Sequence, residues 1–153
     1  ESAAKWEEIL KVHLDHKQTA KSYETGLENE SQDLIFCFAS AHHFMKHKRT
    51  FIEMNRVLKP GGKLLYLHEP VCRRFFYPLS YRRANARRPE VPEDILIYKR
   101  IKKIAQHEGF SCEIKFAPIS RNRSTFGTLY YWFLGKFPFV QHLLPCSADF
   151  LYQ

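Results

Sequence analysis

The sequence is poor in glycine, and it has no apolar run of the length needed to cross a bilayer. Its cysteines are scattered at positions 37, 72, 112 and 146, with no Cys-x-x-Cys pair and no histidine at zinc spacing beside them. A disulfide framework is therefore not expected, and a reducing, cytoplasmic setting is favoured. No basic-then-apolar leader with a small-residue cleavage site is present. Glycine occurs at 26, 61, 62, 109, 127 and 135, and no Gly-x-Gly lies near an N-terminal strand.

What is present fits one globular domain. The chain has 153 residues, of which 44% are hydrophobic and 26% charged. Residues 1–70 hold ten lysines and arginines against ten acids, whereas residues 71–153 hold fourteen against six. The net charge of +8 is thus concentrated in the second half, which bears on partners and not on fold.

The stretch from Asp33 to Pro70 organises the chain. Residues 34–39 form an unbroken apolar run, which predicts a strand covered on both faces. Between residues 46 and 58 the apolar side chains recur three or four apart, which predicts a helix with one buried face. A Lys-Pro-Gly-Gly segment ends this helix, and residues 64–67 resume as a second buried strand. This order predicts a right-handed βαβ unit in a parallel sheet.

The same residues resemble a known family. An Asp-x-Ile strand, Ala-His-His-Phe at 41–44 and Arg-Val-Leu-Lys-Pro-Gly-Gly at 56–62 together resemble the class I S-adenosylmethionine-dependent methyltransferases, notably the type 11 group. The resemblance implies an α/β three-layer sandwich with a Rossmann-like sheet, present from the family's third strand onward and ending in an antiparallel pair. It also implies S-adenosyl-L-methionine as the cofactor.

Several positions take on expected roles through this resemblance. Residues 9–14 would be the family's third strand, and Asp15 and His16, which follow it, would meet the adenine; a turn Asp that caps the next segment is an equally good account. Phe38, Ala39 and Ser40 would line the methionine part of the cofactor. The family's Gly-rich loop and ribose-binding acid have no counterpart, so we expect an N-terminally truncated or excised portion that by itself binds the cofactor poorly.

Three further residues fall where the acceptor would lie. His43 and Glu69 are candidate catalytic residues, His43 as a general base and Glu69 to orient an acceptor hydroxyl, and His42 is a candidate for acceptor binding. Hydrogen bonding to the backbone at a turn is the alternative for the histidines, and a shaping role is favoured over catalysis. No His-x-x-x-His with a nearby acid is present, so no metal is expected. The Pro-Pro-aromatic and Pro-Cys signatures of nucleobase methylation are missing after residue 39, so DNA is not an expected substrate.

The chain is expected to form a single domain covering residues 1–153. Its second half has a basic segment, 71–93, and an aromatic one, 117–146, and both are expected to be insertions on the acceptor side. Arginines at 73, 74, 82, 83, 87 and 88 meet no acidic residue between them. They could form a solvated surface, bind phosphates of a lipid-linked acceptor or a membrane, or bind RNA with aromatic stacking. Arg73, Arg74 and Tyr77 are the candidates for acceptor contact. Residues 126–140 could form an interfacial or lid helix, although a core helix is favoured.

The remaining elements follow from local patterns. Pro92 begins a predicted helix that ends at Gly109, with Ile95, Ile97, Tyr98, Ile101, Ile104 and Ala105 on its buried face. Residues 111–116 and 147–152 predict the two last strands. The sequence thus predicts methyl transfer to an oxygen or nitrogen of a small-molecule or lipid-linked acceptor. The rival is a non-catalytic methyltransferase-like module that binds polyanions or a protein partner through its basic half.

Overall fold

A computed structural model describes residues 11, 20–86, 93–117 and 125–153. Its centre is a mixed sheet of β1 (Gln32–Phe38), β2 (Leu58–Cys72), β5 (Cys146–Tyr152) and β4 (Cys112–Phe116), in that order, with the short β3 (Leu96–Ile97) beside the end of β2. β1 and β3 run parallel to β2, while β5 runs antiparallel to both β2 and β4. The expected parallel βαβ unit and the antiparallel terminal pair are both confirmed.

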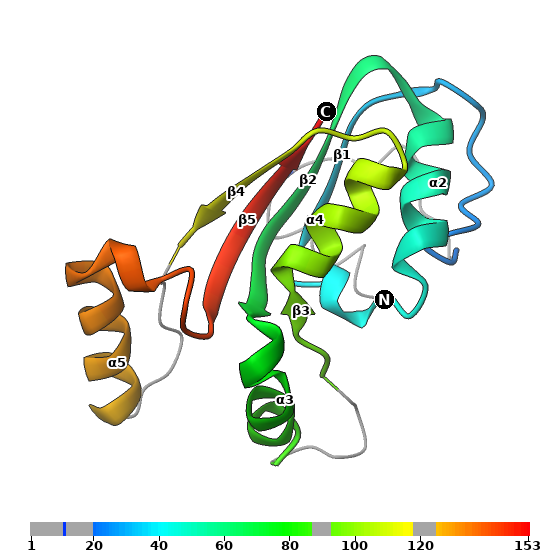
Figure 1. Cartoon of the computed structure of the whole chain (residues 1–153). Helices are drawn as coiled ribbons and strands as arrows, with labels where there is room; N and C mark the ends of the chain where they lie inside the picture. The colour runs from blue at the N-terminus through cyan, green and yellow to red at the C-terminus, as the bar shows by residue number, and fades with distance from the viewer. Residues whose placement is uncertain (1–10, 12–19, 87–92, 118–124) are drawn as a thin grey trace.

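The helices of the described residues lie on one face of this sheet and beyond one of its ends (Figure 1). α2 (His47–Val57) and α4 (Tyr98–His107) lie side by side on the same face. α3 (Tyr77–Asn85) follows the end of β2, and α5 (Thr125–Lys136) lies near the start of β5. Three short 3₁₀ turns complete the described structure: η1 (Ala41–His43), η2 (Arg74–Phe76) and η3 (Pro138–Val140).

The first residues of β2, which directly follow α2, depend on two glycines. α2 buries Phe51, Met54 and Val57 toward the sheet, as the spacing predicts. Gly61 then adopts a φ of 80°, which L side chains rarely tolerate. A Cβ on Gly62 would lie 3.0 Å from the Leu58 side chain and 3.0 Å from the Lys59 carbonyl oxygen. The start of β2 therefore needs glycine at both positions.

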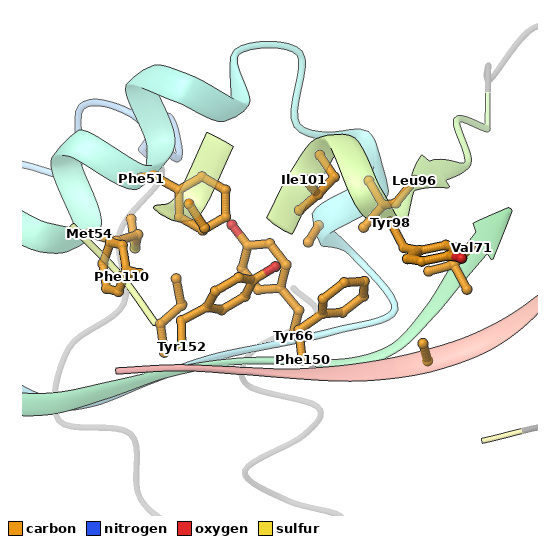
Figure 2. Packing of buried hydrophobic residues seen from close by; sticks show 14 of the residues in the cluster. Phe51, Met54, Tyr66, Val71, Leu96, Tyr98, Ile101, Phe110, Phe150 and Tyr152 are labelled. Carbon is orange, nitrogen blue, oxygen red and sulfur yellow. The ribbon is translucent and has the colours of Figure 1, made fainter. Parts of the chain in front are cut away.

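Aromatic rings form the core between the sheet and the helices (Figure 2). Tyr66 and Tyr152 from neighbouring strands meet edge to face with ring centroids 5.1 Å apart. Phe51 of α2 packs 5.0 Å from Tyr152 and 5.9 Å from Tyr66. Phe110, which follows α4, and Phe150 complete the cluster. Such pairs contribute burial and favourable ring geometry together.

The opposite face of β1 is open in the described structure. Leu34, Phe36 and Phe38 are 52%, 66% and 55% exposed, whereas Ile35 and Cys37, which alternate with them, pack against the core. The expected cover on both faces of this strand is thus not found among the described residues. An apolar run alone does not show whether one face or both are buried.

Two other expectations need correction or stay outside the description. The helix expected from Pro92 begins only at Tyr98, because Leu96 and Ile97 pair with Val71 and Cys72 as β3. Ile95 and Ile97 therefore do not lie on the helix, although Ile101 and Ala105 are buried on it as expected. The strand expected over residues 9–14 lies outside the described residues, apart from residue 11.

The aromatic segment after residue 125 is a helix, but only one side of α5 is buried. Leu134 is fully buried, whereas Phe126, Leu129 and Trp132 are 69%, 60% and 60% exposed. The core-helix expectation therefore holds for one side of α5 only. Among the described residues, no helix is both long and apolar enough to span a membrane.

Candidate active site

A bulge in β2 turns Glu69 toward the helices. In the pairing of β2 with β5, Tyr66 lies opposite Phe150 and Glu69 lies opposite Ala148, so β2 holds one extra residue between the two pairs. Strand side chains alternate between faces, and the extra residue places Glu69 on the same buried face as Tyr66. His68 takes up the bulge with a φ of 56°, and its N–H donates to Asp149 Oδ1 at 2.7 Å.

The buried Glu69 carboxylate holds the turn that follows β1. Its Oε1 accepts hydrogen bonds from the N–H groups of Ser40 and Ala41, both at 2.9 Å. Its Oε2 accepts from the His42 N–H at 3.1 Å and pairs with the His42 ring Nδ1 at 2.7 Å. Glu69 has no exposed surface, so these bonds satisfy a charge that would otherwise be costly to bury.

Hydrogen bonds shift the pKa values of both members of this pair in opposite directions. Burial opposes ionisation of Glu69, but the hydrogen bonds from His42, Ala41 and Ser40 outweigh it and hold the pKa of this carboxyl below its usual value. Burial likewise opposes protonation of His42, but the adjacent carboxylates of Glu69 and Glu93 outweigh it and raise the pKa of the imidazole. Two carboxylates therefore make this part of the molecule favourable for positive charge.

The residues expected at the cofactor lie at the carboxyl end of β1. Ala39 adopts a φ of 45°, which is uncommon for a residue with a Cβ, and its N–H donates to the Leu67 carbonyl at 2.8 Å. The ring of Phe38 stacks on that of His68 with centroids 5.8 Å apart. Phe38, Ala39 and Ser40 are thus placed together at one edge of the sheet, where ligands of open α/β sheets bind. Asp15 and His16 lie outside the described residues.

The histidine pair meets an acid from a distant part of the chain. The rings of His42 and His43 lie with centroids 4.1 Å apart. Glu93 Oε2 lies 3.0 Å from His42 Nε2 and 3.7 Å from His43 Nε2. His42 is buried, whereas the side chains of His43 and Glu93 are 43% and 46% exposed. The ligand atoms of these three residues lie within 4.8 Å of one another.

α3 holds the segment that carries Glu93. The Glu93 N–H donates to Asn85 Oδ1 at 2.7 Å, and Asn85 Nδ2 donates back to the Glu93 carbonyl at 2.8 Å. Tyr77, at the start of α3, donates its hydroxyl to Asp94 Oδ1 at 2.8 Å. Glu93 is therefore fixed from its backbone while its side chain remains partly open to solvent.

The candidates expected at the acceptor thus separate in space. His42, His43 and Glu69 lie together, and Tyr77 reaches the neighbouring Asp94. Arg73 instead donates from Nε to the His142 carbonyl at 3.0 Å, which links the end of β2 to the segment after α5. Arg74, Arg82 and Arg83 are exposed, and Arg87 and Arg88 lie outside the described residues. The functional roles expected for all of these residues stay predictions.

Sequence reasoning missed Glu93, Asn85 and Asp149 as members of this region. Glu93 was assigned to the first turn of a helix, and no residue pattern links it to histidines fifty positions earlier. Only the folding of α3 against the chain brings them together.

Comparison with known proteins agrees with this architecture. Residues 3–66 match the type 11 family model, described as a methyltransferase domain. The YcgJ protein from Bacillus subtilis shares 15% identity over 98% of this chain and 74% of its own, with a TM-score of 0.64. Phosphoethanolamine N-methyltransferase 2 from Haemonchus contortus, solved with S-adenosyl-L-methionine, shares 17% identity over 86% of this chain and 35% of its own, with a TM-score of 0.55.

A further solved structure, a SAM-dependent methyltransferase from Archaeoglobus fulgidus, shares 12% identity over 88% of this chain and 65% of its own, with a TM-score of 0.55. No curated protein matches the chain significantly. The family-model match over residues 3–66 agrees with the resemblance seen in the sequence, and the solved structures show that the chain has the α/β fold of S-adenosylmethionine-dependent methyltransferases.

Proposed function

We propose that this protein transfers the methyl group of S-adenosyl-L-methionine to an oxygen or nitrogen atom of a small-molecule or lipid-linked acceptor. The observation that carries the proposal is the rigid turn at residues 38–42, where Ala39 is in the left-handed region and one buried carboxylate fixes three successive N–H groups. Backbone strain held in place by its surroundings is typical of ligand sites. The solved methyltransferases that share the fold support the cofactor: the Haemonchus contortus enzyme was solved with S-adenosyl-L-methionine.

Glu69 acts in this proposal as a positioning residue and not as a catalytic base. Each of its oxygens already accepts two hydrogen bonds from the turn, and the side chain has no exposed surface. His43, which is half exposed beside it, is the residue that can contact an acceptor. Transfer to an already nucleophilic atom depends mainly on in-line positioning, which a fixed turn supplies.

The first acceptor to test is an amine that carries a phosphate and is methylated on nitrogen. The Haemonchus contortus enzyme was also solved with phosphomonomethylethanolamine and S-adenosylhomocysteine, and it shares 17% identity with this chain. Here Arg74, Arg82 and Arg83 are exposed in and beside α3, and guanidinium groups bind phosphate in a bidentate manner. These arginines are the candidates for that contact.

Calorimetry with S-adenosylhomocysteine tests the cofactor part of the proposal. It should be run on the chain as printed and on any longer native form, with Ala39→Val as the variant, because a β-branched residue is unfavourable at positive φ. We expect binding to the longer form and weaker binding to Ala39→Val. If neither form binds, the rival function, a non-catalytic module that binds polyanions through its basic half, replaces this one.

A further inference from the structure

The cluster of His42, His43 and Glu93 is the one group of described side chains whose donor atoms lie close enough to share a metal ion. Two imidazole nitrogens with one carboxylate form a donor set found in catalytic zinc sites. Donors bound at 2.0–2.1 Å in a tetrahedron lie about 3.3 Å apart. The observed separations from Glu93 Oε2, 3.0 Å to His42 Nε2 and 3.7 Å to His43 Nε2, lie on either side of that value.

The contacts of His42 support the same conclusion. Glu69 Oε2 lies 2.7 Å from ring Nδ1 and orients the ring so that Nε2 faces Glu93 Oε2, 3.0 Å away. A histidine that donates its other nitrogen to a carboxylate is also the usual arrangement behind a metal ligand.

We propose that His42 Nε2, His43 Nε2 and Glu93 bind a divalent transition-metal ion such as Zn²⁺, with Glu69 orienting His42 from behind. His43 and Glu93 are half exposed, so a metal here keeps an open side for water or for an oxygen or nitrogen of a bound ligand. Asn85 preorganises the site by holding the Glu93 backbone through two hydrogen bonds. In the metal-bound protein, His43 is a ligand and not a base.

This inference does not depend on methyl transfer and is tested without it. Zn²⁺ is added to the purified, metal-stripped protein, and affinity is measured by calorimetry. Glu93→Gln and His43→Asn each remove one ligand from a half-exposed position, so the fold should survive; far-UV circular dichroism and the metal-free Tm check this. The matched control is His107→Gln, which removes an exposed histidine whose Nδ1 lies 3.0 Å from Glu108 Oε1 at the end of α4.

We expect the wild-type protein to bind one Zn²⁺ and to rise in Tm with excess zinc, since a ligand that binds only the folded state stabilises it. Glu93→Gln and His43→Asn should each bind at least about tenfold more weakly, a loss that even indirect partners of a metal ligand can cause. His107→Gln should bind like the wild type. Co²⁺ in place of Zn²⁺ should give visible absorption bands of a tetrahedral site in the wild type but not in Glu93→Gln.

Two results overturn the proposal. If the wild-type protein binds neither Zn²⁺ nor Co²⁺, His42 is instead a protonated link that donates to both Glu69 and Glu93. If Glu93→Gln and His43→Asn bind Zn²⁺ as tightly as the wild type, the metal is held elsewhere in the chain.

Discussion

Glu69 Oε2 contacts His42 twice, accepting from its backbone N–H at 3.1 Å and pairing with its ring Nδ1 at 2.7 Å. One carboxylate oxygen thereby fixes both the position of the residue and the orientation of its ring. The β2 bulge at His68 makes this possible, because it turns Glu69 to the side of the sheet where η1 lies. The candidate site is therefore built on the sheet itself and not on a free loop.

Glu69→Ala should destabilise the protein strongly. It leaves the N–H groups of Ser40, Ala41 and His42 without their acceptor, and each buried unsatisfied donor costs about 1–3 kcal/mol. We expect the free energy of unfolding to fall by about 3 kcal/mol or more, measured by urea denaturation. Glu24→Ala, at an exposed surface ion pair, should change it by less than about 1 kcal/mol. Equal effects of the two variants would contradict the holding role of Glu69.

Tyr66→Phe should be neutral or stabilising by about 1 kcal/mol. The Tyr66 hydroxyl is buried and has no hydrogen-bond partner among the described residues, and burial raises the pKa of this phenol well above its usual value. Tyr98→Phe is the matched control, because the Tyr98 hydroxyl donates to the His142 carbonyl at 2.8 Å. That variant should lose about 1 kcal/mol. A loss of the same size in Tyr66→Phe would mean that its hydroxyl has a partner.

Lowering the pH should remove the contribution of Glu53 to the free energy of unfolding. Hydrogen bonds from Arg56, and further ones from Thr25, hold the pKa of Glu53 at about 2, below the ordinary 4.5. A depressed carboxyl pKa stabilises the folded state above the unfolded pKa, and this stability is lost as the pH falls from about 4.5 to about 2. The difference in unfolding free energy between wild type and Glu53→Gln should therefore shrink across this window. A difference that stays constant from pH 7 to pH 2 would refute the assignment.

Replacement by threonine should change the free energy of unfolding by different amounts at two neighbouring positions in β1. Phe36 is 66% exposed, so Phe36→Thr should change the free energy of unfolding by no more than about 0.5 kcal/mol and should reduce binding of an apolar dye. Ile35 packs against the core, so Ile35→Thr should cost about 2 kcal/mol. If both variants unfold alike, the two faces of β1 are buried to the same extent.

Replacing exposed arginines should show whether they bind the acceptor or form a general polyanion-binding surface. If Arg74 and Arg82 bind an acceptor phosphate, replacing both with alanine should raise the acceptor KM and leave binding to generic RNA or anionic vesicles nearly unchanged. If they form a general surface, the logarithm of the RNA binding constant should fall with the logarithm of the salt concentration, with a slope of about −0.7 per neutralised phosphate. The double variant should then show a less steep salt dependence. Arg49→Ala with Lys63→Ala, also exposed but on other elements, is the matched control.

Local patterns predicted the parts of the fold that depend on neighbours in the chain. The three- and four-residue spacing in α2 and the glycines at 61 and 62 sufficed for the βαβ unit. β3 was missed because two residues, Leu96 and Ile97, are too few to show an alternating pattern. The exposed face of β1 was missed because an apolar run is the same whether or not a layer covers it.

The site was predicted only in part, for a comparable reason. The turn residues 38–43 and Glu69 were identified because each lies at or just beyond the end of a predicted strand, although β2 continues to Cys72 and holds Glu69 within it. Glu93 joins them only because Asn85 and Tyr77 hold its segment to α3, and nothing in the sequence pairs these residues. The bulge at His68 depends on one extra residue in β2, which leaves no periodic signal.

The position of β5 between β2 and β4 sets the order in which the molecule can fold during synthesis. Tyr66 lies opposite Phe150, and Cys112 lies opposite Tyr152. Neither β2 nor β4 can therefore form its pairing with β5 until this last strand has been synthesised. β1, α2 and β2 can form their unit while the ribosome is still translating the second half, but the aromatic core stays open until residue 152 has emerged. Ribosome-bound chains that stop before residue 146 should therefore bind chaperones that recognise exposed apolar surface, and release them once β5 is added.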